Sequence, residues 1–261
     1  MSDASAFRRD GDDRGVLCLH GFTGTPFEMR FLGESLAARG MTVVGPALVG
    51  HGQTLDALDV TTWRDWHAGV CAEFDALRAR CRSVAVVGQS LGGLLALHLA
   101  RERGAELSSL CVMGVPLWLP PLARVAIPLV RELRRITSHP RAIPKRGGSD
   151  VRDPEMKRLN PCLPAFPVRA LASLNEFTDV VRATIEQVTV PTLVAHGAHD
   201  HVAPPACGVE LARRLGTSLL TLPRSYHLVS MDVDRVALAQ AVGDFVAARF
   251  DTRPDARTQA R

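Results

Sequence analysis

Gly88-Gln89-Ser90-Leu91-Gly92-Gly93 is the stretch of sequence that decides the fold. It follows an apolar β-type run at 83–87 and precedes a helical run at 94–103, so it places a serine on a strand-to-helix turn. Such a turn crowds the backbone of the serine, and the two flanking glycines remove side chains that would block neighbouring segments. The hydroxyl would then lie above the free N–H groups of a helix N-terminus. The stretch therefore predicts an exposed nucleophile.

Composition and charge indicate a globular chain. Of its 261 residues, 46% are hydrophobic and 22% are charged, which is enough apolar material for one large core or two modest ones. The net charge of +4 comes from 31 basic and 27 acidic residues, with no basic run interleaved with aromatic residues. This distribution argues against nucleic acid as a partner.

Residues 83–100 carry no formal charge and are long enough to require a test for a membrane span. They contain Gln89, Ser90, His98 and three glycines, and their pattern changes from β-type to helical, so we expect no transmembrane segment. The six cysteines form no Cys-x-x-Cys pair and are predicted to be reduced and mostly buried. The N-terminal segment lacks the apolar core of a secretory signal, so we expect a cytoplasmic location.

Strand-like and helical segments alternate along the chain. The expected strands are 15–19, 41–45, 84–88, 107–113, 192–196 and 218–222, and the expected helices are 26–39, 62–80, 91–103, 204–215 and 233–249. This alternation implies right-handed crossovers and a mostly parallel sheet with helices on both faces. The predicted fold class is α/β.

The alternation stops between residues 116 and 190. About seventy residues there have no strand signal, although helical patterns occur near 153–159 and 167–187. We interpret this insertion as a small, mainly helical cap over the site. The expected organisation is a flexible N-terminal segment at 1–14, a core of 15–115 and 191–250, a cap at 116–190 and a flexible tail at 251–261.

A serine nucleophile needs a base to take its proton, and the base needs an acid to hold its tautomer. In open α/β sheets, reactive groups gather at the carboxyl ends of the strands. Asp200 follows the expected strand at 192–196, and His227 follows the last strand in the loop before the final helix. Asp232 and Asp234 also follow the last strand, but they fit helix capping better.

With these residues in place, the chain resembles the α/β-hydrolase superfamily over nearly all of 15–250. It is similar to bacterial carboxylesterases and monoacylglycerol-lipase-like enzymes in the small cap and in three motifs, His20-Gly21-Phe22-Thr23-Gly24, Gly50-His51-Gly52 and Gly88-Gln89-Ser90-Leu91-Gly92-Gly93. The resemblance implies an α/β-hydrolase fold. Larger relatives have two or more extra strands before the first motif strand, and only about fourteen residues precede it here, so we expect a reduced sheet of six or seven strands with residues 6–9 as a short edge strand.

The same resemblance assigns the roles in the site. Ser90 would be the nucleophile, His227 the general base and then acid, and Asp200 the orienting carboxylate. The backbone N–H groups of Leu91 and Phe22 would form the oxyanion hole. The expected function is a serine carboxylesterase acting on esters with short- to medium-chain acyl groups, monoacylglycerols among them, with no cofactor and no metal.

Other functions use the same triad and stay open at this point. They are the hydrolysis of thioesters or carbon–carbon bonds and acyl transfer, because the substrate is read by the cap and not by the triad. A non-catalytic ligand receptor is a more distant alternative. The expected partner is a small-molecule ester, and transient contact with lipid aggregates and a monomeric or homodimeric state are also left open.

Several further side chains are assigned to the surroundings of the site. His196, His199 and His201 stand beside Asp200, but one strand and turn cannot present all of them to a metal ion, so they are expected to be structural. His20 and His51 are expected to brace loops beneath the site. Trp118 and Val202 are assigned to the substrate pocket. The apolar face of the cap, which would pack on the core or line an acyl tunnel, comprises Leu117, Trp118, Leu119, Leu122, Val125, Ile127, Leu129 and Val130.

Overall fold

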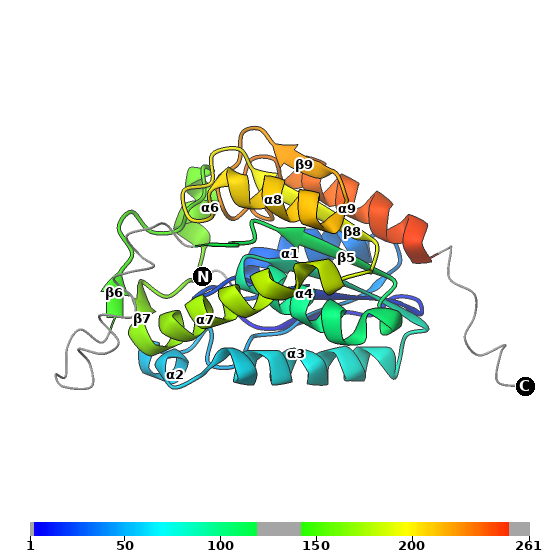
Figure 1. The fold of residues 1–261 in the computed structure, drawn as a ribbon, viewed down its shortest axis with the longest axis horizontal. Coiled ribbons are helices and arrows are strands. Elements are labelled where there is room, and N and C mark those ends of the chain that lie inside the picture. The colour runs from blue at the N-terminus through cyan, green and yellow to red at the C-terminus, as the bar shows by residue number, and fades with distance from the viewer. Residues whose placement is uncertain (1–2, 119–141, 251–261) are drawn as a thin grey trace, which may run out of the picture.

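The structure is a computed structural model that describes residues 3–118 and 142–250. Its centre is a seven-stranded sheet in the order β1-β3-β2-β4-β5-β8-β9 (Figure 1). β1 is antiparallel to β3, and every other neighbouring pair in this sheet is parallel. The predicted α/β class, the mostly parallel sheet and the number of strands are confirmed.

The elements have the following bounds. The strands of the main sheet are β1 (Phe7–Arg9), β2 (Arg14–Leu19), β3 (Thr42–Gly45), β4 (Ser83–Gln89), β5 (Ser109–Met113), β8 (Thr192–Gly197) and β9 (Leu219–Leu222). The helices are α1 (Phe27–Ala37), α2 (Leu55–Asp59), α3 (Trp63–Arg78), α4 (Leu91–Arg103), α6 (Pro154–Leu159), α7 (Val168–Thr184), α8 (Pro205–Leu215) and α9 (Arg235–Phe250). A second, two-stranded sheet consists of β6 (Ala142–Pro144) and β7 (Ala165–Pro167).

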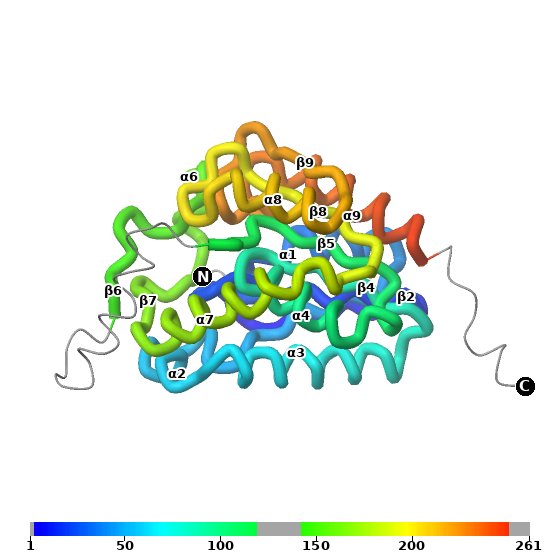
Figure 2. Tube along the Cα trace, in the orientation of Figure 1, coloured from blue at the N-terminus to red at the C-terminus, as the bar shows by residue number. Residues whose placement is uncertain are grey.

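Side chains of the central strands alternate between two hydrophobic cores. In β4, Val84 and Val86 face the core that α3, α4, α7 and α8 cover, whereas Ala85 and Val87 face the core that α1 and α9 cover. This period of two follows from the pleat of a strand that is buried on both faces. Figure 2 shows α3, α4 and α7 side by side on one face of the sheet, and these helices are in mutual contact.

The residues between β5 and β8 differ from the expectation in one respect. Although this insertion carries no strand signal, it contains β6 and β7, which pair antiparallel with each other. Each has only three residues and ends in a proline, Pro144 or Pro167, so neither is long enough to show alternation. Outside this insertion, between β3 and α3, the structure also has α2, a five-residue helix that was not expected.

The N-terminal segment expected to be flexible includes an ordered strand. Residues 7–9 form β1, the short edge strand that the resemblance implied, and the side chain of Phe7 is buried. Its ring fills space left by two glycines, because a Cβ on Gly33 or Gly45 would lie 2.5 Å or 2.2 Å from it. Phe7 therefore anchors the antiparallel edge of the sheet.

No helix in the described ranges, 3–118 and 142–250, is long and apolar enough to cross a bilayer. All six cysteines lie in these ranges and are free, four of them buried and two, Cys71 and Cys162, half-buried. The predicted flexible tail at 251–261 lies outside the described residues, and so do six residues of the predicted apolar cap face, Leu119, Leu122, Val125, Ile127, Leu129 and Val130.

Replacing Phe7 with alanine should destabilise the fold by about 3–5 kcal/mol, because the substitution leaves a cavity at Gly33 and Gly45. Urea unfolding of the two proteins measures the difference. Arg8→Ala, on the same strand but with a side chain 38% exposed, is the matched control and should change stability little. Equal losses in both variants would show that β1 does not depend on this ring.

Candidate active site

Ser90 occupies a strained turn between β4 and α4. Its φ is +55° and its ψ is −117°, a conformation that costs a non-glycine residue roughly 1–3 kcal/mol. The turn is held because the Ser90 N–H donates to Met113 O at 2.8 Å. Gly88 and Gly92 make it sterically feasible: a Cβ on Gly88 would lie 2.2 Å from Gly92 O, and one on Gly92 would lie 2.2 Å from a carbonyl of β2.

Three side chains predicted from separate strand ends meet at this turn. His227 Nε2 lies 2.9 Å from Ser90 Oγ, and His227 Nδ1 lies 2.8 Å from Asp200 Oδ2. Since a carboxylate only accepts, the Nδ1–H of His227 donates to Asp200, and Nε2 is left to accept the Ser90 hydroxyl proton. All three residues are buried, so the expectation of an exposed nucleophile is corrected: Ser90 is 8% exposed, because neighbouring segments pack closely around its turn. The arrangement can take a proton from a serine during nucleophilic attack.

Asp200 is fixed by backbone and side-chain donors. Its Oδ1 accepts from the N–H groups of Val202 at 2.8 Å and Ala203 at 2.7 Å. Its Oδ2 also lies 3.1 Å from His196 Nε2. Burial opposes ionisation, but the charge of His227 and the hydrogen bonds from His196 and His227 outweigh it and hold the pKa of Asp200 well below its usual value.

The pKa of His227 is shifted in the opposite direction to that of Asp200. Burial disfavours the imidazolium form of His227, but the charge of Asp200 and the hydrogen bond to it outweigh burial, so the pKa of His227 is raised above its usual 6.5. The charges of Asp150 and Glu28 act in the same direction. Because the imidazole must be neutral to accept a proton, its function is lost as the pH falls through this raised pKa.

The loop after β2 lies directly beside Ser90. A Cβ on Gly21 would contact Ser90 Cβ at 3.5 Å, so the next residue, Phe22, is close to the nucleophile. Among the hydrogen bonds of the described residues, none is donated by the backbone N–H of Phe22 or of Leu91. These two groups, which the resemblance assigns to the oxyanion hole, are thus free of protein acceptors in the described part of the chain.

His20 and His51 hold this loop in the way the sequence suggested. The Nδ1–H of His20 donates to Gly21 O at 2.9 Å, and its Nε2 accepts from the Leu48 N–H at 3.1 Å. The ring of His51 packs edge-on against that of His20. Burial lowers the pKa of His20 to about 4 and that of His51 to about 3, so both are neutral braces.

Glu28 is a buried carboxyl group that the sequence reasoning missed. Its Oε2 accepts from the Gly21 N–H at 2.9 Å, so the first turn of α1 holds the loop beside Ser90. A Cβ on Gly24 would overlap the carboxyl group, at 2.2 Å from its Oε1. Burial raises the pKa of Glu28 above its usual value. The available signal in the sequence was the position of Glu28, an acidic residue beside the apolar positions of a helix, α1, that packs on the sheet.

Asp150, from the insertion, is a second residue that was missed. Its Oδ2 accepts from the His227 N–H at 3.2 Å and from the His201 N–H at 3.0 Å, and its Oδ1 lies 2.8 Å from His201 Nδ1. Its carbonyl accepts from the Leu228 N–H at 3.2 Å. The insertion thus holds the loop that carries the base. Nothing local in the sequence marks Asp150, since these partners are 51 and 77 residues away.

The expected capping role of Asp232 and Asp234 is corrected. The Asp232 carboxylate accepts from the N–H groups of Arg152, Asp153 and Tyr226, so it joins the insertion to the loop of His227. Asp234 accepts from the Arg224 N–H and the Ser225 hydroxyl, which brace the same loop. Both carboxylates accept hydrogen bonds from the backbone of the loop before α9, so they stabilise the loop that carries His227.

The remaining predicted residues lie around the triad. His196 contacts Asp200 and Ala203 O. His199 and His201 both contact the ring of Tyr226, and His201 also binds Asp150. The three histidines do not converge on one point. Trp118 is half-buried against the core that includes α4 and α7. The side chain of Val202 is exposed, while its N–H contacts Asp200.

Comparisons with known proteins agree with this architecture. A family model, Hydrolase_4, described as serine aminopeptidase, S33, matches residues 12–234. The chain is 30% identical over 253 residues to a thermostable monoacylglycerol lipase of Bacillus sp. (strain H-257), covering 95% of this chain and 96% of that protein. It is 28% identical over 247 residues to a carboxylesterase of Bacillus subtilis (strain 168), covering 92% and 95%.

Similarity to solved structures extends over the same range. A structure reported with the metagenome-derived lipolytic enzymes LipS and LipT superposes with a TM-score of 0.86 at 29% identity, covering 94% of this chain and 98% of that one. Monoacylglycerol lipase of Paleococcus ferrophilus has the same fold, with a TM-score of 0.78 at 16% identity. The predicted resemblance to α/β hydrolases is therefore confirmed.

Asp200→Asn should lower kcat/KM for a p-nitrophenyl ester by about 10⁴-fold, because an amide can donate to His227 Nδ1 and so favours the wrong tautomer. The acidic limb of the pH profile should also move to lower pH, since the charge that raises the pKa of His227 is gone. Asp179→Asn, on the exposed face of α7, is the control. A loss smaller than tenfold would contradict the orienting role of Asp200.

Asp150→Asn should move the acidic limb of kcat/KM to lower pH, in the same direction but by less. The negative charge of Asp150 raises the pKa of His227, but Asp150 is bonded to the backbone N–H of His227 and not to its ring, so its effect is smaller than that of Asp200. Steady-state rates measured across the pH range report the shift. His201→Gln removes the ring that contacts Asp150 Oδ1, keeps the backbone donor to Asp150 and leaves the Asp150 carboxylate in place, so it should not move the limb. A shift in this variant alone would contradict the assignment.

Proposed function

The chain belongs to the Hydrolase_4 family, described as serine aminopeptidase, S33, and from this membership and the geometry of the site we propose that it is a serine carboxylesterase. It is a hydrolase similar to carboxylesterases and monoacylglycerol lipases. The substrates we propose are carboxylic esters with short- to medium-chain acyl groups, monoacylglycerols among them. The names of the two Bacillus relatives, monoacylglycerol lipase and carboxylesterase, support this class.

One observation carries the proposal. Ser90, His227 and Asp200 form a continuous chain of hydrogen bonds of 2.9 Å and 2.8 Å at the start of α4. A serine whose hydroxyl faces a neutral imidazole, which in turn donates to a buried carboxylate, is the arrangement that activates serine for acyl transfer. A packing role for Ser90 would not require the base, the acid and the strained φ together.

The proposed reaction has two halves. In the first, Ser90 Oγ bonds to the ester carbonyl carbon while His227 Nε2 takes the hydroxyl proton, and the N–H groups of Leu91 and Phe22 stabilise the oxyanion. The carbon–oxygen bond to the alcohol then breaks, and His227 gives its proton to the leaving alkoxide. In the second half, His227 takes a proton from water, the hydroxide attacks the acyl-enzyme, and the acid leaves as Ser90 is reprotonated.

We also propose that residues 116–190 act as a cap over a core made of 15–115 and 191–250. Two contacts support this role, because the insertion touches both loops of the site. The Leu163 N–H donates to Thr23 O at 2.9 Å beside the proposed oxyanion hole, and Asp150 binds the backbone of His227. Trp118, in the cap, and Val202, in the core, stay assigned to the wall of the substrate pocket.

A series of p-nitrophenyl esters from acetate to palmitate tests the function and the substrate class together. We expect kcat/KM to be highest for short to medium chains and to fall by about 10⁶-fold in Ser90→Ala, because no other group replaces the nucleophile. A fluorophosphonate should label the wild-type chain at Ser90 in a 1:1 ratio.

Ser35→Ala, which changes a half-buried serine on α1, is the matched control and should retain activity and labelling. Unchanged turnover in Ser90→Ala would remove the proposal. Thioesters of the same acyl groups, assayed in parallel, decide between the alternatives, since a carboxylesterase should prefer the oxygen ester and a thioesterase should reverse the order.

A further inference from the structure

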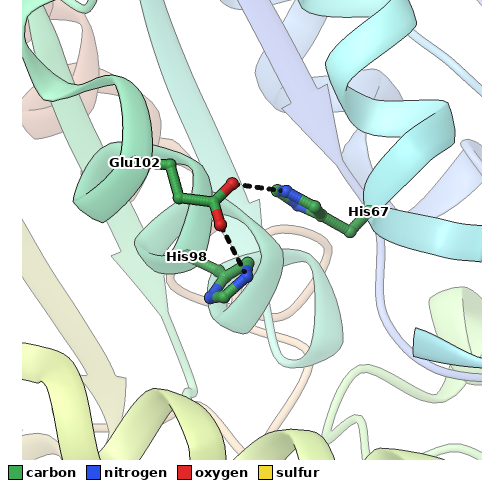
Figure 3. Close-up of side chains that lie close together, drawn as sticks. All are labelled: His67, His98 and Glu102. Atoms are coloured by element: carbon green, nitrogen blue, oxygen red, sulfur yellow. Dashed lines mark hydrogen bonds and ion pairs between the residues drawn. The ribbon is translucent and has the colours of Figure 1, made fainter. Parts of the chain in front are cut away.

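Four side chains of metal-ligand type face one another between α3 and α4. They form two pairs spaced four residues apart, which places each pair on one helix face: His67 and Cys71 on α3, and His98 and Glu102 on α4. Figure 3 shows both imidazole rings turned toward the carboxylate of Glu102. Glu102 Oε2 lies 2.8 Å from His67 Nε2, and Oε1 lies 3.3 Å from His98 Nε2.

The spacing of the donor atoms suits a small cation. The ligand atoms of His67, His98 and Glu102 all lie within 4.8 Å of one another, and Cys71 Sγ lies 3.5 Å from His67 Nε2. In a tetrahedral Zn²⁺ site, bond lengths of about 2.0–2.3 Å separate neighbouring ligand atoms by roughly 3.3–3.7 Å. Small side-chain rotations would therefore bring these atoms into coordination geometry.

We propose that His67, His98 and Glu102 form a binding site for a divalent transition-metal ion, with Zn²⁺ as the best-matched ion and Cys71 as the fourth donor. Two imidazole nitrogens, one carboxylate oxygen and a thiolate sulfur form a borderline-soft donor set, which Zn²⁺ prefers. Cys71 would release its thiol proton to solvent when the ion binds. Ca²⁺ and Mg²⁺ require mostly oxygen ligands and are disfavoured by this set.

The surroundings hold the ligands in place. His98 is 5% exposed. Its ring packs edge-on against the rings of Trp63 and Phe177, with centroids 5.5 Å and 5.3 Å apart. These two rings hold His98 with its Nε2 toward Glu102. The side chains of His67 and Glu102 are 14% and 36% exposed, so an ion can enter from the side of Glu102. The site is thus rigid on the core side and open to solvent on the other.

A hydrogen-bonded carboxylate between two histidines is the competing explanation, and it needs no ion. That arrangement uses His67, His98 and Glu102 but does not require a thiol beside the same His67 nitrogen. Arg101 Nη2 also lies 2.7 Å from Glu102 Oε1, so an ion has to compete with a guanidinium for that oxygen. We therefore expect weaker binding than at a zinc finger, in the micromolar range.

The bound ion would have a structural role. Ser90 and His98 are eight residues apart on α4, which is about 12 Å along the helix, so the ion would not touch the reacting atoms. It would instead link α3 to the helix that follows the nucleophile. Trp63, whose ring contacts that of His98, also links α3 to α7, because its backbone N–H donates to Ser173 Oγ at 2.9 Å. The ion would therefore stiffen the junction of α3, α4 and α7.

The test uses the full chain, first treated with a chelator and then titrated with Zn²⁺ or Co²⁺. We expect one ion per chain by elemental analysis, a higher Tm in the presence of Zn²⁺, and the visible absorption of tetrahedral Co²⁺. His67→Gln and Glu102→Gln should each weaken binding at least tenfold. Cys71→Ser should remove the sulfur-to-cobalt charge-transfer band, and absence of that band from the wild-type spectrum would overturn the assignment of Cys71.

Two control variants separate this site from other surface groups. His199→Gln and Glu73→Gln, both at exposed positions, should bind the ions as the wild type does. Ester hydrolysis by Glu102→Gln should be unchanged, and its circular dichroism shows whether it is folded. The proposal is overturned if the wild type takes up no stoichiometric ion, or if folded Glu102→Gln and His67→Gln bind Zn²⁺ as tightly as the wild type.

Discussion

The contact of three backbone segments at Gly88, Gly92 and the end of β2 is the constraint on which the site depends. No side chain fits between these segments, since an added Cβ would lie 2.2 Å from a carbonyl oxygen at either glycine. The start of α4 is thereby held against the end of β2, and the loop after β2 lies beside Ser90. The strain at Ser90 is offset by a backbone bond to β5, so the parallel sheet itself maintains the conformation of the nucleophile.

Three carboxylates around His227, two of them buried and that of Asp150 half-buried, depend on the same framework. Asp200, Asp150 and Asp232 each accept backbone N–H bonds from loops at the carboxyl edge of the sheet. A buried charge is costly unless it is hydrogen-bonded, and here fixed backbone donors supply those bonds. The bonds that shape the loop also keep Asp200 charged, and that charge favours the protonated form of His227. Loop structure and base strength therefore have one physical origin.

Features with a local signal were predictable from the sequence. The strands of the main sheet are marked by short apolar runs, the Ser90 turn by its glycines, and most of the long helices by a period of about 3.6 residues, all within single segments. Asp200 and His227 could be selected because each follows a strand. β6 and β7 could not be predicted, because a strand of three residues shows no period. Asp150 could not be predicted either, because its contacts depend on where the insertion folds back. Asp232 was misjudged because its partners belong to that insertion.

The α4 helix shows why side-chain clusters between elements are the hardest features to predict. Its residues from Leu91 to Ala100 are all buried, so an apolar side chain would be expected at every position. His98 is the exception, and a buried imidazole is stable there only if its polar atoms find partners. Glu102 is the partner of its Nε2, and the ring of His67 packs edge-on against it, whereas its Nδ1 has no hydrogen-bond partner among the described residues. His67 is 31 residues earlier, on a helix whose contact with α4 depends on the whole sheet. The polar residue in an apolar helix is thus the local sign, and only the packing of α3 against α4 shows what it contacts.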